Sequence, residues 1–596
     1  MLSFASGHHA HSPRASRASR KIRIGLYLAC TALSAPLQAG VPTMAAAASP
    51  QPAPEAREEP FQDPAIVAAA ADEGVVVVSR DDVYILEQRV VTSGDDSPAI
   101  FGRSTGGGVT IINGEAETAG DDSVGIFAEA EGEGRNADVN AGTVITQGDN
   151  SGGIMVRAEG GYVQDSPYGP LAYGNAIVTS QDVRTSGANS IGVAAQSIGG
   201  AALVTSNQVA TQGDGSIGIQ AIGDAVVQVT SESVTTAGVG ATGINAQSSE
   251  GGVTVQSGSV ATTDAGAAGI VAEGYADVVV ISDSVSTAGD PVGKETPAAV
   301  GILASSEAGN VVVESGAVST QGRGATGIQA NAYGGVTITS ASVTALGDGA
   351  KGIDVSNVTG AVNIDSGIVD VSGDLAHGIN VLSEQGRVNI TSAAVTTRGD
   401  FSSGIKVVPG GSVTIDSGTV DTTGDYAMGI EIFSTGGDVT VASGAITTDG
   451  TRSNGISAVA LTSGGDVDIE ADSVATGGFS SDAIYASAGS NLTVKAGSLS
   501  TRGEESTGVF ANAYDSVGIT VESIATQGAL SAGVSAQSEG GSVAVEVGSV
   551  TTAGDSSVGI YGGALEDVTI AAGSVVTTGD RLVRTDPDTG ETIYFD

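Results

Sequence analysis

The sequence predicts an all-β protein, folded as a single elongated parallel β-helix (β-solenoid) of about 18 rungs of ~26 residues with three short strands each. A Gly-Ile or Gly-Val step recurs along most of the chain. The apolar residues around it alternate with the period of two that is typical of strands. With 90 glycines, 15% charged residues and no Trp, the composition also disfavours a helical or mixed globular enzyme.

The repeated glycine sets the rung length. In the two longest regular runs it is spaced by 25 or 26 residues: Gly192, Gly218, Gly243, Gly269, and then Gly327, Gly352, Gly378, Gly404, Gly429, Gly455. Three apolar columns keep a fixed offset from it, as Ile328, Val318 and Val313 do around Gly327. We expect each column to stack on itself from rung to rung and to fill one side of the interior.

A threonine lies two residues after the second column in many rungs, at Thr211, Thr236, Thr262, Thr397, Thr422 and Thr552. It has the inward parity of that column. We therefore expect its hydroxyl to be buried and to form a chain of hydrogen bonds beside the turn. Glycines are expected where the chain needs a positive φ or a close approach.

The repeats occupy residues 76–580. Residues 1–48 read as a signal peptide with an extended basic n-region, residues 49–75 as an Ala/Pro-rich linker or cap, and residues 581–596 as an irregular tail. We expect either this tail or a continuation of the natural chain to cover the end of the rod. The single cysteine, Cys30, lies in the leader, so the repeats contain no disulfide and no cysteine metal site.

Charge excludes one class of partner. The formal charge is −44, and because the first 54 residues carry five basic residues and no acid, the remainder carries −49. Binding to phosphate requires clustered Lys and Arg, so we expect no nucleic-acid partner.

The regular spacing is interrupted at residues 157–176, an insertion that carries Tyr162, Tyr168 and Tyr173. Shorter irregularities lie at 129–136 and 291–297. Insertions project from one face of a repeat protein, where binding is common, so the three tyrosines are candidate ligand contacts. The alternative is a surface loop that the repeat tolerates.

The turn after the second column often reads Thr-x-Gly-Asp. Asp348, Asp374, Asp400 and Asp425 fall in successive rungs, ~4.8 Å apart if the strands pair. They form a candidate weak cation ladder, for which Ca²⁺ is suited. The favoured interpretation is that each aspartate hydrogen-bonds its own turn, and no other cofactor is expected.

Two further motifs have simple explanations. Arg398-Gly399-Asp400 spells an integrin-type tripeptide but occupies the position of the Thr-x-Gly-Asp turns, so we interpret it as a variant of that turn. His377, the only histidine of the repeats, precedes a repeat glycine and is expected to be an exposed turn residue.

Two stretches, GGSVTIDSGTVDTTGDYAMGIEIFS (Gly410 to Ser434) and GSVTTAGDSSVGIYGG (Gly548 to Gly563), lie behind a long basic signal. Together they resemble the repeat-built passenger regions of bacterial autotransporters, the type V secretion family. The resemblance covers about residues 76–580. It implies export across the inner membrane and a β-helix that is displayed at the cell surface on the outer membrane or secreted, often as an adhesin.

The chain departs from that family in lacking a C-terminal translocator barrel, since it ends at Tyr594-Phe595-Asp596. The resemblance therefore implies an outer-membrane barrel in the same longer chain or in a separate protein. A protein that is exported by another route is the alternative.

We expect a non-enzymatic exported surface protein, a stalk or adhesin, whose partner is a host or neighbouring-cell surface or an extracellular polysaccharide. The alternative is a carbohydrate-active β-helix that binds or cleaves polysaccharide, which needs converging carboxylates and aromatic platforms. The acidic residues are spread evenly, and the aromatic residues Phe127, Tyr485, Phe510 and Tyr561 occur singly at outward positions, which favours the non-enzymatic protein.

Overall fold

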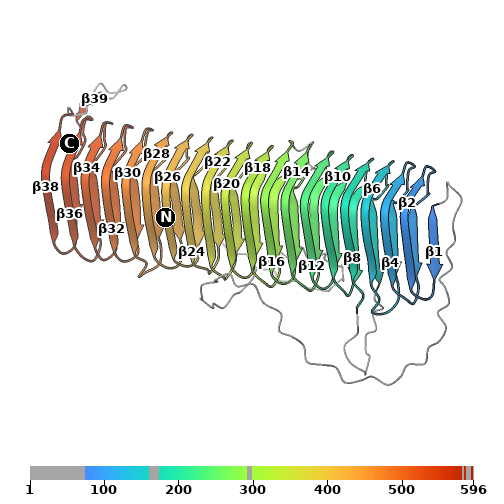
Figure 1. Cartoon of the computed structure of the whole chain (residues 1–596). Coiled ribbons are helices and arrows are strands. Elements are labelled where there is room, and N and C mark those ends of the chain that lie inside the picture. The colour runs from blue at the N-terminus through green and yellow to red at the C-terminus, as the bar shows by residue number, and fades with distance from the viewer. Residues whose placement is uncertain (1–73, 160–172, 291–297, 580–582, 586–591, 595–596) are drawn as a thin grey trace, which may run out of the picture.

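The computed structural model describes residues 74–159, 173–290, 298–579, 583–585 and 592–594. These residues form a straight rod with β1 near one end and β38 at the other (Figure 1). The described residues form strands joined by turns, bends and short irregular segments, without any helix. Consequently, no helix of the described residues is long and apolar enough to cross a membrane.

Each rung contributes one strand to each of two parallel sheets. Sheet A consists of the shorter strands β1 (Val75–Ser79), β3 (Ile100–Ser104), β5 (Ile126–Ala130), β7 (Ile154–Glu159), β9 (Ile191–Ile198), β11 (Ile217–Gly223), β13 (Thr242–Ser248), β15 (Ile270–Gly274), β17 (Val300–Ser306), β19 (Thr326–Ala332), β21 (Ile353–Asn357), β23 (Ile379–Ser383), β25 (Ile405–Pro409), β27 (Ile430–Ser434), β29 (Ile456–Ala460), β31 (Ile484–Ala488), β33 (Val509–Ala513), β35 (Val534–Ser538) and β37 (Ile560–Gly563).

Sheet B consists of the longer strands β2 (Val83–Thr92), β4 (Val109–Thr118), β6 (Ala137–Gln147), β8 (Ala176–Ser186), β10 (Ala202–Gln212), β12 (Val227–Ala237), β14 (Val253–Thr263), β16 (Val278–Ala288), β18 (Val311–Gln321), β20 (Val336–Leu346), β22 (Val362–Ser372), β24 (Val388–Arg398), β26 (Val413–Thr423), β28 (Val439–Asp449), β30 (Val467–Thr476), β32 (Leu492–Thr501), β34 (Val517–Thr526), β36 (Val543–Thr552) and β38 (Val568–Thr577). A short antiparallel hairpin, β39 (Val583–Thr585) with β40 (Thr592–Tyr594), follows.

The predicted fold class is confirmed: the described residues form an all-β parallel solenoid of 19 turns. In both sheets each strand pairs in parallel with its equivalent in the next rung. Val313 therefore lies beside Ile338, and Val318 beside Val343. At ~4.8 Å per paired strand, the 18 intervals between 19 rungs give a rod of roughly 86 Å.

The number of strands per rung differs from the prediction of three. Val313 and Val318 belong to the same hydrogen-bonded strand, β18. Five residues apart, they would face opposite sides of a flat strand, yet both are buried. Pairing with β20 includes Ser315 and Ala317 but omits Gly316, so the strand bends there and one residue is left unpaired. Each rung thus has three inward faces supplied by two strands.

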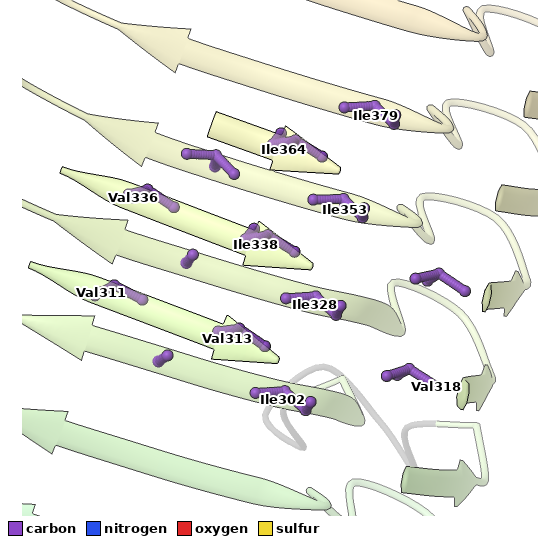
Figure 2. Packing of buried hydrophobic residues seen from close by; sticks show 14 of the residues in the cluster. Ile302, Val311, Val313, Val318, Ile328, Val336, Ile338, Ile353, Ile364 and Ile379 are labelled. Atoms are coloured by element: carbon purple, nitrogen blue, oxygen red, sulfur yellow. The ribbon is translucent and has the colours of Figure 1, made fainter. Parts of the chain in front are cut away.

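The three predicted columns fill the interior. Ile302, Ile328 and Ile353 stack along sheet A, opposite the valines and isoleucines of sheet B (Figure 2). All three isoleucines are completely buried. Burial of each such side chain contributes roughly 1.5–3 kcal/mol, so the columns are the main source of stability.

The repeated glycine is required by close approach. A Cβ atom added to Gly327 would lie 2.4 Å from Cγ1 of Val343 and 2.6 Å from the carbonyl oxygen of Gly352. Its φ is not positive, in contrast to Gly399 in the turn, where φ is 141°. The Gly-Ile step therefore keeps sheet A close enough to the second column for the interior to be filled.

Rung-to-rung pairing is weakest at one point of sheet A. β25 pairs with β27 only from Ile405 to Val407, whereas β23 pairs with β25 over five residues, from Ile379 to Ser383. Pro409, at the end of β25, has no backbone N–H to donate.

Candidate functional site

The Thr-x-Gly-Asp turns form a continuous edge along the rod, where each aspartate is bonded to the next rung. The backbone N–H of Asp374 donates to Oδ1 of Asp348 (3.1 Å). The same bond joins Asp400 to Asp374 (2.9 Å) and Asp425 to Asp400 (2.8 Å). The sequence placed the aspartates correctly in one line, but their acceptor role is to the neighbouring rung and not to their own turn.

Serines in the same turns make a second set of bonds between rungs. The N–H of Ser453 donates to Oγ of Ser481 (2.9 Å), and that Oγ–H donates to the carbonyl of Gly450 (2.9 Å). Ser481 and Ser506 are related in the same way (2.9 Å). The turns that carry these serines are therefore tied to their neighbours by side chains as well as by strands.

The predicted threonine column is buried, as expected, but its hydroxyls do not bond to one another. Oγ1 of Thr422, for example, donates to the carbonyl of Ala427 in its own turn (3.0 Å). A second group of buried threonine hydroxyls has no hydrogen-bond partner among the described residues: Thr185, Thr211, Thr236, Thr262, Thr287, Thr320, Thr526 and Thr552.

Backbone pairing explains two of these unpartnered hydroxyls. The carbonyl five residues after Thr211 is that of Ser216, which accepts the N–H of Thr242 from the next rung (3.1 Å). The carbonyl five residues after Thr185, that of Ser190, similarly accepts from Ile217 (3.3 Å). In these rungs the backbone uses the acceptor that the threonine uses elsewhere.

The cation ladder stays a prediction. Asp348, Asp374, Asp400 and Asp425 are exposed and in line, and the amide bonds to Oδ1 already offset part of their mutual repulsion. Within the described ranges, no group of three or more His, Cys, Asp or Glu side chains is placed to hold a metal ion.

The candidate insertion is only partly described. Tyr162 and Tyr168 lie outside the described residues. Tyr173 is exposed, and its ring covers Gly199, where an added Cβ would meet Cδ1 of the ring at 2.2 Å. The proposed role of the three tyrosines in ligand contact remains a prediction.

The Arg-Gly-Asp tripeptide is an ordinary member of the turn edge. The guanidinium of Arg398 donates to Oδ1 of Asp370 (2.6 Å), and Asp400 accepts from the next rung as described above. Gly399 has the same positive φ as the turn glycines Gly373 and Gly424. These contacts agree with its interpretation as a turn variant.

His377 is not an exposed turn residue, which corrects the prediction. It is half-buried, and its Nδ1 accepts the N–H of Ser403 (3.1 Å). Burial, followed by the positive charge of Lys406, lowers the pKa of His377 to about 4. The imidazole is therefore neutral at pH 7. Beside it, Lys406 pairs with Glu431 (2.8 Å), whose second oxygen accepts from Oγ of Ser403 (2.9 Å).

The aromatic residues are not all single. Tyr485 stacks on Phe510 with ring centroids 5.1 Å apart, and Phe101 stacks on Phe127 at 5.0 Å. Each pair lies in adjacent rungs of sheet A. Stacking covers one face of each ring, so these pairs stabilise the rod and offer less platform for a sugar than isolated rings would.

One carboxyl group has an unusual environment. Asp482 is half-buried, and burial raises its pKa to about 6 despite the hydrogen bond that it accepts from the N–H of Thr507 (2.6 Å). Such a group is a candidate proton donor. No sequence pattern indicated this group, because Asp482 occupies a variable position before Ala483.

Shallow grooves follow the bend of sheet B. One is lined by Glu470, Asp472, Lys495 and Glu522. Another, many rungs away, is lined by Asn207, Glu232, Gly258 and Asp283. Asp472 and Glu232 occupy equivalent positions in their strands, so the grooves arise from the bend that every rung shares.

The fold and the turn edge define a parallel β-solenoid repeat protein. Comparison of the chain with protein-family models, with curated proteins and with solved structures gave no match.

Proposed function

We propose that the protein is a non-enzymatic, exported surface protein, similar to an autotransporter passenger, that acts as a stalk or adhesin. The observation that carries this proposal is the unbroken ladder from β1 to β38, in which both sheets and the turn edge connect every rung to the next. A rod of this kind holds its lateral surface at a fixed distance from its base. The resemblance of the repeats and the basic leader supports export.

The experiment uses intact cells of the source organism. External protease should remove the rod while a cytoplasmic marker survives, and the purified protein should bind saturably to cells of a host or neighbouring species. Full protection from the protease would refute surface exposure. An exposed rod without saturable binding would leave a stalk and refute an adhesin.

A carbohydrate-active protein is the second candidate, and Asp482 is the observation that favours it. A carboxyl group with a pKa near 6 suits general acid catalysis near neutral pH. The purified protein would be incubated with acidic polysaccharides while reducing ends and unsaturated products are followed. Turnover that is abolished in Asp482→Asn would replace the non-enzymatic proposal, and absence of turnover would support it.

A further inference from the structure

Four successive rungs in the middle of the rod carry a row of apolar side chains on one face. On the outward face of sheet A, one position holds Leu382, Val408, Phe433 and Val459 in β23, β25, β27 and β29. In the rungs on either side the same position is polar, with Asn331 and Ser356 before this row and Ser487 and Asn512 after it. Leu382 is 46% and Phe433 45% exposed.

The turn edge of the same rungs carries a second row. Leu375, Phe401, Tyr426 and Arg452 occupy the turn position with positive φ. Phe401 stacks on Tyr426 at 4.8 Å, and Arg452 lies over the other side of the stack, 5.5 Å from the Tyr426 centroid. The preceding rungs have Gly324 and Gly349 at this position. Both rows together, with the side chains between them, are called the lateral patch.

The centre of the lateral patch contains charges that are already neutralised. Lys406 pairs with Glu431, and the neutral His377 accepts a backbone hydrogen bond. In the rung just before the patch, Lys351 pairs with Asp354 (2.8 Å). A partner that covers the centre between the two rows would bury no unpaired charge there, which is the arrangement that interfaces favour. The aromatic residues and Arg452 are also the residue types that most often dominate binding.

The rim on the turn side is acidic. Asp374, Asp400 and Asp425 lie immediately beside the second apolar row, each exposed and each with Oδ1 bonded to a backbone amide. Around an apolar centre, this line of carboxylates is complementary to a row of Lys or Arg. A second copy of the chain is disfavoured, because its charge is also −44 and its own aspartates would approach this rim.

We propose that the lateral patch is a docking surface for a partner protein that presents apolar side chains flanked by basic residues. Four rungs of ~4.8 Å and seven residues of ~3.3 Å give a surface about 20 Å on each side. Such an area is well below that of a standard stable interface, so the complex is weak and transient. The proposal concerns the lateral surface of the rod and rests on the proposed function only for access to that surface.

The test uses the purified full chain and a displayed library of random peptides as the probe. Enriched peptides should combine Leu, Phe or Trp with Lys or Arg. Leu382→Ser/Phe433→Ser should weaken their binding about tenfold or more. The matched control is Tyr275→Ser/Tyr333→Ser, which removes two similarly exposed aromatic residues elsewhere on the rod. Equal melting temperatures would establish that all variants fold.

A charge variant separates the two parts of the surface. Asp374→Asn/Asp400→Asn/Asp425→Asn retains a side-chain acceptor for each backbone amide, as Asn136 does for Asn175 (2.9 Å). It should weaken peptide binding and reduce its dependence on salt.

Several results would overturn the proposal. They are the absence of enriched peptides, enrichment of acidic peptides, and peptides that bind the Leu382→Ser/Phe433→Ser variant as tightly as the parent. Sedimentation that reveals a dimer lost in this variant would assign the patch to a second copy, and glycan-array binding lost in it would assign the patch to carbohydrate. Protease protection on intact cells would overturn the proposed function while leaving peptide binding to the patch intact.

Discussion

The same substitution should have opposite effects at two positions of the threonine column. Thr422 and Thr211 are both buried, and Val371 occupies the same column in another rung and is fully buried, so valine fits the column. Oγ1 of Thr422 donates to Ala427, whereas Oγ1 of Thr211 has no partner among the described residues.

These contacts determine the magnitudes. Thr422→Val removes a hydrogen bond and leaves the buried carbonyl of Ala427 without this donor, which should reduce the free energy of unfolding by about 1–2 kcal/mol. Thr211→Val removes a buried hydroxyl without a partner and should raise it by about 1 kcal/mol. The two chemically identical changes are therefore expected to differ by about 2–3 kcal/mol.

Native-state hydrogen exchange is the appropriate assay, because a repeat rod opens locally. Peptides that span β26 should lose protection in Thr422→Val, and peptides that span β10 should gain it in Thr211→Val. The urea midpoint gives a global check. Equal destabilisation by both variants would refute the reasoning, since it would mean that an ordered water or another group satisfies the Thr211 hydroxyl.

Other predictions concern the glycine column, pH and the turn edge. Gly327→Ala should lower the free energy of unfolding by about 1–3 kcal/mol through overpacking, whereas Gly518→Ala, with no atom closer than 4.0 Å to the new Cβ, should be neutral or slightly stabilising in urea titrations. Because the folded-state pKa of His377 is depressed to about 4, its contribution to stability is lost as pH falls from about 6.5, and His377→Gln should flatten this limb. The raised pKa of Asp482, about 6 against 3.8, acts oppositely: stability falls as pH rises through this window, and Asp482→Asn should stabilise the protein at neutral pH by up to about 3 kcal/mol. Asp400→Asn should change stability by less than about 0.5 kcal/mol and Asp400→Ala should lower it by about 1 kcal/mol. A melting temperature that rises in millimolar Ca²⁺ for the parent and not for Asp400→Asn would support the cation ladder, and an unchanged melt of the parent would remove it.

The interior could be predicted from the sequence because every rung must solve the same packing problem. A residue such as Ile328 contacts its equivalents in the rungs on both sides, so the same residue type returns at a fixed spacing. The bend at Gly316 was harder to predict. The five-residue separation of Val313 and Val318 fits either two strands or one bent strand, and hydrogen bonding distinguishes them only in the structure.

The surface features were harder to predict, because they depend on side-chain contacts between neighbouring rungs, and the spacing of residues in the sequence does not reveal these contacts. His377 is neutral because burial, followed by the positive charge of Lys406 in the next rung, lowers its pKa, and Ser403 of the same neighbouring rung donates its N–H to the imidazole. The Tyr485–Phe510 stack was accessible in principle, because the two residues are 25 positions apart and share a column. The partner of each aspartate carboxylate could not be predicted from the sequence. An aspartate that accepts from its own turn and one that accepts from the next turn occur in the same Thr-x-Gly-Asp motif, and only the distance between rungs distinguishes them.

The shortened pairing between β25 and β27 has a mechanical consequence. Tension along the rod passes through every interface between rungs in series, so all interfaces bear the same force and the one with the fewest bonds yields first. Within a single interface the bonds share the load. Pairing in sheet A is limited here to Ile405–Val407, and Pro409 has no N–H to donate. We therefore expect sheet A of a pulled rod to separate first between these two strands, in the middle of the lateral patch.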